Sequence, residues 1–287
     1  MKILILGITG MLGSMLFREY SRNSNHEVWG TLRQPDGQFH FDQNIRHRML
    51  PNTDILNQDT LVDVFSTVRP DVVINCVGVI KQLSHANDPL AVLPVNALLP
   101  HRLARLCSLS NTRLIHISTD CVFSGRKGRY TESDLSDAED LYGKSKFMGE
   151  IHDLSHVVTL RTSIIGHELS THYALLDWFL SQKEQVRGFS KAIYSGLPTV
   201  ELARIVLDSV IPRPQLSGLY HVASAPISKL DLLRLVATRY KKNIDIIPDD
   251  SVIIDRSLCA DRFHAATDYT APDWAALVSM MHQSRLH

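Results

Sequence analysis

Tyr142 and Lys146 lie four residues apart in the segment DLYGKSKFMGE at residues 140–150. If this segment is helical, the two side chains share one face of the helix, one turn apart. A tyrosine can deliver a proton to a developing alkoxide, but its ordinary pKa is about 10. A neighbouring ammonium favours the phenolate, so we expect Lys146 to lower the pKa of Tyr142 toward the working pH. The pair alone also fits a solvated helix face, so its assignment depends on the rest of the chain.

A second group of residues indicates a hydride carrier for this chemistry. The sequence GITGMLG follows an apolar run at residues 2–6 and opens a helical pattern over residues 11–20. Gly7 permits a tight turn, Gly10 lets a pyrophosphate approach the backbone, and Gly13 allows close helix–strand packing. The helix N-terminus offers unpaired N–H groups to the phosphates. We therefore predict a dinucleotide site, with a structural glycine turn as the alternative, and its loop residues are Gly7, Thr9, Gly10, Met11, Leu12 and Gly13.

The spacing GxxGxxG resembles that of the extended short-chain dehydrogenase/reductase family, and this resemblance implies that Asp54 and Ile55 lie near the adenine ring. The predicted second strand, residues 26–32, is followed by no acidic residue that would bind the free 2′-hydroxyl of NADH. Arg33 suits the 2′-phosphate of NADPH, because a guanidinium matches phosphate geometry. We therefore expect NADPH as the cofactor, with NADH possible. The alternative is that Arg33 is a solvated loop charge.

Further residues for the site stand at the ends of three other predicted strands. The strand at 71–79 ends in NCVGV, the strand at 113–119 ends in Ser118-Thr119, and another strand covers 157–163. Ligands of open parallel sheets bind outside the carboxyl ends of the strands, so Ser118 or Thr119 should face the nicotinamide. We expect the Thr119 hydroxyl to polarise a substrate ketone beside Tyr142. The residues assigned here to the cofactor are Cys76, Val77, Gly78, Ser118 and Thr162.

Strands that alternate with helices predict the fold class that would position these groups. Helical patterns cover residues 61–68, before Pro70, and residues 95–107, where Pro100 is a kink or a local start. The alternation implies a Rossmann-type, doubly wound parallel α/β sheet. After about residue 165 it weakens, although residues 227–240 form an amphipathic helix with Ser228 as its N-cap. We predict a dinucleotide-binding domain at 1–165 and a smaller substrate-binding lobe at 166–287. We expect some of the chain after residue 165 to cross back to the dinucleotide-binding domain.

Composition excludes several other classes of protein. The 287 residues include 30 basic and 30 acidic side chains, so the balance gives no sign of nucleic-acid or anionic-membrane binding. The longest apolar runs are too short to span a bilayer, and the first one breaks at Gly7 without a cleavage pattern, so we expect a strand there. Four cysteines form no CxxC pair and the histidines no HExxH motif, so we expect no metal site and a cytoplasmic location.

Several motifs together resemble the dTDP-4-dehydrorhamnose reductase family. HISTDCVFSG at 116–125, LYGKSKFMGE at 141–150, LRTSIIG at 160–166, SGLPTVELA at 195–203 and DRSLCADRF at 255–263 look like its characteristic segments. The resemblance implies hydride transfer to the 4-keto group of a nucleotide-linked 4-keto-6-deoxy sugar, in deoxysugar supply for surface polysaccharide. It implies that Tyr142 donates the proton while Lys146 also holds the nicotinamide ribose. We expect a monomer or a homodimer.

The substrate itself is less well specified, because two family positions differ. The position after Ser-Thr-Asp, often tyrosine, is Cys121, and the aromatic after Arg-Thr-Ser is Ile164. A related 4-keto-6-deoxy sugar, such as an N-acetylated one on UDP, is as plausible as the rhamnose precursor. The residues that we assign to the substrate are Lys81, Asp120, Cys121, Phe123, Ile164 and Arg256.

Three other functions occur in the same superfamily besides reduction: dehydration, epimerisation and a non-catalytic regulatory role. Related 4,6-dehydratases carry Thr-Asp-Glu where this chain has Thr119-Asp120-Cys121, and a cysteine is a poor general base at its ordinary pKa. Dehydration is therefore disfavoured. Epimerases keep the Tyr/Lys pair, so epimerisation stays open. One branch of the family is a non-catalytic regulatory subunit of methionine adenosyltransferase, and the intact Thr119, Tyr142 and Lys146 favour catalysis over that role.

Overall fold

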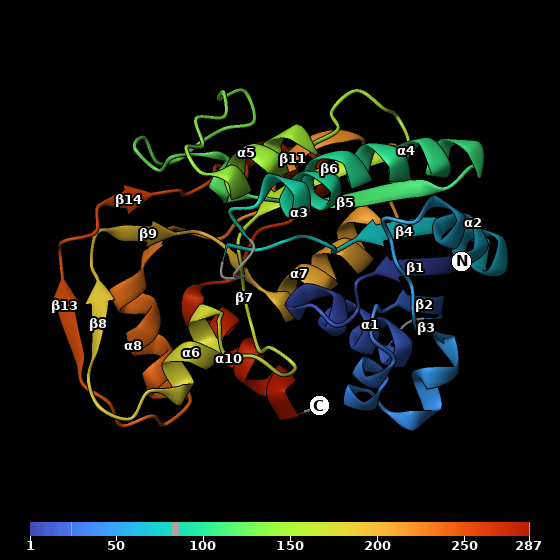
Figure 1. Cartoon of the computed structure of the whole chain (residues 1–287). Coiled ribbons are helices and arrows are strands. Elements are labelled where there is room, and N and C mark those ends of the chain that lie inside the picture. Colours follow the sequence, from blue (N-terminus) through green and yellow to red (C-terminus); the bar gives the residue numbers. More distant parts are fainter. Residues whose placement is uncertain (24, 82–85, 287) are drawn as a thin grey trace.

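The computed structural model describes residues 1–23, 25–81 and 86–286, and its centre is a seven-stranded parallel sheet (Figure 1). The strands run in the order β3-β2-β1-β4-β5-β6-β11, and each neighbouring pair is parallel. Their bounds are β1 Lys2–Leu6, β2 Glu27–Thr31, β3 Met49–Leu50, β4 Val72–Asn75, β5 Arg113–Thr119, β6 Val157–Thr162 and β11 Gly218–His221. The direction of winding reverses between β1 and β4, which confirms the predicted doubly wound α/β fold.

Both faces of this sheet are buried, as the alternation along β1 shows. Ile3 and Ile5 belong to one hydrophobic cluster, whereas Leu4 and Leu6 belong to another. The first cluster includes side chains of α1 (Met11–Asn23), α7 (Thr199–Ile205) and α10 (Trp274–Gln283), and the second includes those of α2 (Gln58–Val68) and α4 (Leu99–Leu109). In Figure 1, α1, α7 and α10 lie on one side of the sheet and α4 lies on the other. Burial on both faces explains why the central strands β1 and β4 are largely apolar.

The turn between β1 and α1 is held by backbone geometry that only glycine provides. Gly7 has a φ of +83°, and the N–H of Gly10 donates to its carbonyl oxygen at 3.2 Å. A Cβ atom on Gly13 would stand 2.2 Å from the Gly7 carbonyl oxygen, which is far inside van der Waals contact. The first turn of α1 therefore lies directly against the end of β1.

Two predicted elements differ from the observed ones by several residues at one end. The strand predicted at 71–79 ends at Asn75, because side-chain hydrogen bonds hold the backbone beyond it: Asn75 Oδ1 accepts from the Val77 N–H, and Asn96 Oδ1 accepts from the Val79 N–H. The helix predicted at 95–107 begins earlier, at Pro89, where Asp88 is the N-cap. It runs through α3 (Pro89–Leu93), a π-helical turn (Pro94–Leu98) and α4, in whose first turn Pro100 lies.

The remaining elements build a smaller lobe beside the sheet, to the left in Figure 1. Its strands form three small sheets: β12-β9-β14 (Ile227–Ser228, Ala192–Tyr194, Ile254–Asp255), β13-β8 (Ile246–Asp249, Val186–Phe189) and β10-β7 (Leu197–Pro198, Ile164–Ile165). Its helices are α6 (Leu175–Ser181) and α8 (Lys229–Arg239), whereas α9 (Asp261–Thr267) packs against β11 through Phe263 and Tyr220. Ser228 caps α8 as predicted, since its hydroxyl accepts from the Asp231 N–H. β11 and α7 come from the C-terminal half of the sequence and pack with the large sheet.

Short helical turns complete the described elements. They are Pro35–His40, Gln43–Arg48, Asp120–Val122, Val206–Val210 and Ser284–Leu286. Helix α5, which carries Tyr142 and Lys146, spans Leu141–Met148. None of the helices in the described part of the chain combines the length and hydropathy that a membrane span requires.

We predict that Gly13→Ala destabilises the protein by roughly 1–3 kcal/mol, because the added methyl group has no space beside Gly7. Gly10→Ala is the matched control, since the nearest atom to its Cβ would be 3.5 Å away. Urea denaturation followed by circular dichroism measures both variants. Equal stability of the two variants would contradict the close approach.

Candidate active site

The predicted reacting groups line one cavity of about 730 Å³ between the carboxyl ends of the strands and the smaller lobe. Thr119, Tyr142 and Lys146 all contribute to its wall. The predicted cofactor residues that line it are Thr9, Gly10, Met11, Leu12, Cys76, Val77, Gly78, Ser118 and Thr162. The predicted substrate residues that line it are Lys81, Asp120, Cys121, Ile164 and Arg256. Residues more than 240 positions apart in the sequence therefore meet at one site.

Several predicted site residues lie outside this cavity. Gly7 and Gly13 form the turn behind its wall, while Arg33 and Asp54 are exposed and Ile55 is half-buried. The segment that follows Arg33 lies close to the phosphate loop, because a Cβ atom on Gly37 would stand 2.7 Å from Cγ2 of Thr9. The segment after β2 thus passes beside that loop.

Phe123 was predicted to contact the substrate, and the structure gives it a packing role instead. Its side chain is fully buried and stacks on Tyr130 with ring centroids 4.0 Å apart. Only its backbone turns toward the site, because the Phe123 carbonyl accepts from Nε of Arg256 at 2.7 Å. The Phe123 ring is therefore part of the apolar core of the 120–140 loop.

Helix α5 presents Tyr142 and Lys146 to the cavity. The helix begins after Asp140, whose carboxylate accepts from the Gly143 N–H at 2.7 Å. A Cβ atom on Gly143 would be 2.2 Å from the Cys121 carbonyl oxygen, so α5 packs closely against the end of β5. The other Asp140 oxygen pairs with Lys81 at 2.5 Å, and the Lys81 ammonium lies 5.6 Å from the centre of the Tyr142 ring.

Burial raises the pKa of Tyr142 above its ordinary value, and the neighbouring Cys121 adds to this shift. A hydrogen bond with Thr119 opposes it without overcoming it. The spacing of Tyr142 and Lys146 predicts a lowered pKa, and this prediction is wrong in the structure, because desolvation of the phenol is the largest cause of the shift and raises the pKa. Tyr142 is therefore a neutral phenol at physiological pH, which is the form that a proton donor needs.

Lys146 is a buried cation, with 5% of its surface exposed. Its ammonium donates a hydrogen bond to the Ile117 carbonyl oxygen at 2.8 Å. Burial lowers its pKa to about 8, and the charge of Glu150 opposes this shift. Lys146 thus carries its charge at neutral pH and loses it in the mildly alkaline range.

Thr119, Asp120 and Cys121 form the floor of the cavity beside Tyr142. The Thr119 hydroxyl donates to Asp120 at 3.2 Å and accepts from the Cys121 N–H at 3.1 Å. Burial raises the pKa of Asp120, although the charge of Arg256 opposes the shift. Burial also raises the pKa of the Cys121 thiol to about 12, so this thiol is neutral and cannot replace the glutamate base of a dehydratase.

Sequence reasoning missed one side of the cavity, which the smaller lobe supplies. The loop from Glu168 to Ala174 lines it, and this loop is closed by the Glu168 carboxylate, which accepts from the Thr171 hydroxyl and the Ala174 N–H. Further lining residues are Ser163, Leu175, Ile193, Tyr194, Lys229, Val252 and Ile254. Of these, only Ser163, in LRTSIIG, and Lys229, at the start of the predicted helix 227–240, lie in a recognised pattern.

Asn96 is a second residue that the sequence did not single out. It is buried, and its side chain bonds both backbone groups of Val79 and the Ser145 hydroxyl. It therefore ties the segment after β4 to helix α5. The π-helical turn that carries Asn96 has no reliable sequence signal, although such turns are frequent at functional sites.

The wall below the phosphate loop fits a dinucleotide. Gly10 and Gly78 keep side chains out of this part of the cavity, and the first turn of α1 directs its N–H groups to the same place. Within the described residues, no group of three or more histidine, cysteine or acidic side chains is arranged to hold a metal ion.

Comparisons with known proteins agree with this geometry. The model of the RmlD substrate binding domain family matches residues 1–252. The beta subunit of methionine adenosyltransferase 2 from Bos taurus is 28% identical over 149 residues, which are 52% of this chain and 41% of that subunit, so the match spans less than half of its length.

Two further proteins match over nearly the whole chain. The probable low-salt glycan biosynthesis reductase Agl14 of Haloferax volcanii is 27% identical over 90% of this chain and 84% of its own. The crystal structure of a hypothetical dTDP-4-dehydrorhamnose reductase from Sulfolobus tokodaii superimposes with a TM-score of 0.78 at 25% identity, over 96% of this chain and 98% of that one. With this fold, this cavity and a family match over residues 1–252, the chain belongs to the RmlD substrate binding domain family.

Proposed function

We propose that this protein is an NADPH-dependent reductase of the 4-keto group of a nucleotide-linked 4-keto-6-deoxy sugar. The observation that carries the proposal is the convergence of Thr119, Tyr142 and Lys146 on one cavity with the glycine loop. The names of the Haloferax and Sulfolobus relatives, both reductases, support it. The proposed setting is deoxysugar synthesis for surface polysaccharide in the cytoplasm, by a monomer or a homodimer.

Each reacting group has a chemical role in this proposal. The nicotinamide, when bound, supplies the hydride to the ketone carbon. The Tyr142 phenol gives its proton to the oxygen that becomes the alcohol, and the Thr119 hydroxyl donates a hydrogen bond to the same oxygen. The Lys146 ammonium holds the nicotinamide ribose hydroxyls and stabilises the phenolate that Tyr142 leaves behind.

Two cations support a nucleotide-linked substrate. Lys229 and Arg256 line the lobe side of the cavity, and ammonium and guanidinium groups suit a diphosphate. Cys121 and Ile164, which stand where the family often has aromatic residues, also line the cavity. We expect these two side chains to distinguish the sugar from the rhamnose precursor.

A non-catalytic role as a regulatory subunit is the second candidate, because the methionine adenosyltransferase subunit is among the relatives. Epimerisation is the third, since it uses the same tyrosine and lysine. Net consumption of NADPH separates reduction from both: an epimerase regenerates its cofactor, and a regulatory subunit binds it without turnover.

We predict that the purified protein oxidises NADPH when it is supplied with one of the dTDP-, UDP- or GDP-linked 4-keto-6-deoxy sugars. Tyr142→Phe should lower kcat by roughly 10²- to 10⁴-fold, because it removes the proton donor while leaving the ring in place. NADPH absorbance measures the rate and mass spectrometry identifies the reduced sugar. Tyr220→Phe is the matched control, because Tyr220 lies on β11 and is not among the residues that line the cavity.

Two outcomes would count against this proposal. Tight NADPH binding without turnover of any of these sugars would favour the regulatory role. Full activity of Tyr142→Phe would remove Tyr142 from the mechanism even if reduction takes place.

Cofactor choice gives a separate prediction. Arg33→Ala should weaken NADPH binding by roughly 10-fold or more and leave NADH binding unchanged, because only NADPH carries the 2′-phosphate. Arg105→Ala, another exposed arginine, on α4, is the control. Fluorescence titration with both cofactors measures the dissociation constants. Equal losses of affinity for NADPH and NADH would show that Arg33 does not bind the 2′-phosphate.

The pKa of Lys146 predicts how activity depends on pH. Below about pH 8 the ammonium is charged, and above it the charge is lost. Tyr142 remains protonated throughout this range, since burial raises its pKa. We therefore expect kcat/KM for NADPH to fall as pH rises through about 8. A profile that stays flat to pH 10 would contradict a charged Lys146 in the working site.

A further inference from the structure

A buried ion pair lies immediately behind Lys146. Glu150 and Arg161 are 7% and 1% exposed, and two parallel hydrogen bonds join them, Nε to Oε1 at 2.7 Å and a terminal nitrogen to Oε2 at 2.6 Å. Neither residue is among those that line the cavity. The chemistry proposed above does not use this pair, so its position calls for another explanation.

Adjacent residues of β5 hold Lys146 and Glu150. The Lys146 ammonium donates to the carbonyl oxygen of Ile117, and the hydroxyl of Ser118 donates to Glu150 at 2.6 Å. Glu150 follows Lys146 by four residues, one turn further along, just past the end of α5. The cation and the carboxylate are thus both fixed to the strand whose next residue is Thr119.

Glu150 is ionised although it is buried. Burial alone would raise its pKa, but hydrogen bonds from Arg161, His152 and Ser118, together with the charge of Arg161, hold the pKa below its ordinary value. The carboxylate therefore remains negative at every pH at which the protein is expected to work.

The groups that interact electrostatically with Lys146 differ in charge. Glu150 is negative, whereas burial raises the pKa of Cys76 to about 12 and lowers that of His116 well below its ordinary value. The thiol and the imidazole are therefore both neutral near pH 8. Of these three neighbours, Glu150 alone supplies a charge that favours the ammonium.

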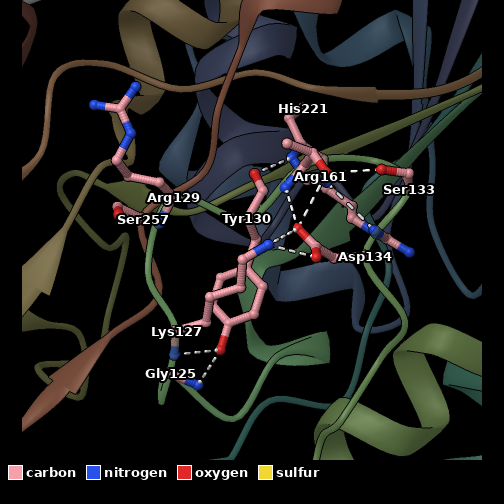
Figure 2. A network of polar contacts seen from close by, with 10 residues as sticks. Gly125, Lys127, Arg129, Tyr130, Ser133, Asp134, Arg161, His221 and Ser257 are labelled. Carbon is pink, nitrogen blue, oxygen red and sulfur yellow. Dashed lines mark hydrogen bonds and ion pairs between the residues drawn. The ribbon is translucent and has the colours of Figure 1, made fainter.

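Arg161 is itself fixed from its far side, as Figure 2 shows. It lies 3.3 Å from Nε2 of His221, and the other ring nitrogen of His221 lies 3.1 Å from the Tyr130 carbonyl oxygen. Burial and the charge of Arg161 lower the pKa of His221 to about 4, so the ring is neutral. A neutral ring that accepts from Arg161 must donate through Nδ1 to Tyr130, so its tautomer is determined. The Arg161 guanidinium also lies 5.1 Å from the centre of the Phe123 ring.

We propose that Glu150 is a positioning residue for Lys146: clamped by Arg161 and Ser118, it keeps the buried amine charged and fixed at the cofactor ribose. This inference rests on the proposed cofactor role of Lys146, and not on the identity of the sugar. Removal of the carboxylate leaves the burial of the amine unopposed, so the amine should lose its proton at a lower pH.

The test is the pH dependence of NADPH binding by Glu150→Gln, measured by cofactor fluorescence without any sugar. In the wild-type protein we expect affinity to fall with a midpoint near pH 8, where Lys146 titrates. In Glu150→Gln the midpoint should move about one pH unit lower. Glu201→Gln is the matched control, because Glu201 is also fully buried and pairs with an arginine, but lies on α7 outside the cavity.

A second variant is needed because Glu150→Gln leaves the Arg161 charge buried without its partner and can destabilise the fold for that reason alone. The double variant Glu150→Gln/Arg161→Gln removes both charges and should show the same lowered midpoint. A wild-type midpoint in either folded variant overturns the proposal. Since binding is measured without substrate, this result is independent of whether any sugar is reduced.

Discussion

Desolvation of one ammonium group is the constraint around which the site is organised. Lys146 extends to the cavity wall from a helix packed against the sheet, so its charge is largely removed from water. Such burial is costly unless polar partners compensate. The Ile117 carbonyl and the Glu150 carboxylate provide this compensation, and the Arg161 guanidinium behind Glu150 keeps that carboxylate ionised. The charge of Lys146 at the cavity wall thus depends on a polar cluster that extends beyond the cavity.

The cavity wall could be predicted from the sequence where one rule applied. In a parallel sheet the carboxyl ends of the strands share one edge, so Cys76, Ser118 and Thr162 could be placed together without coordinates. The glycine spacing likewise indicated a close approach that the Gly13–Gly7 geometry displays. These inferences succeeded because each depends on backbone conformation and local order alone.

The electrostatics and the lobe could not be predicted in the same way. The pKa of Tyr142 depends on how much protein covers the phenol, and a spacing of four residues contains no information on burial. The role of Phe123 and the end of the strand predicted at 71–79 were misjudged. Phe123 stacks on Tyr130, and Asn75 Oδ1 accepts from the Val77 N–H, so the strand ends at Asn75. The loop from Glu168 to Ala174 has no periodicity, so its place over the cavity follows only from tertiary packing.

The π-helical turn at Pro94–Leu98 constrains the length of its segment. Here the Leu99 N–H bonds to the Pro94 carbonyl, five residues back instead of four. The extra residue rotates everything after it by about 100° relative to an uninterrupted α-helix. With that rotation, Leu99, Leu103 and Cys107 are buried. Loss of one residue from this turn would therefore direct the apolar stripe of α4 away from the sheet.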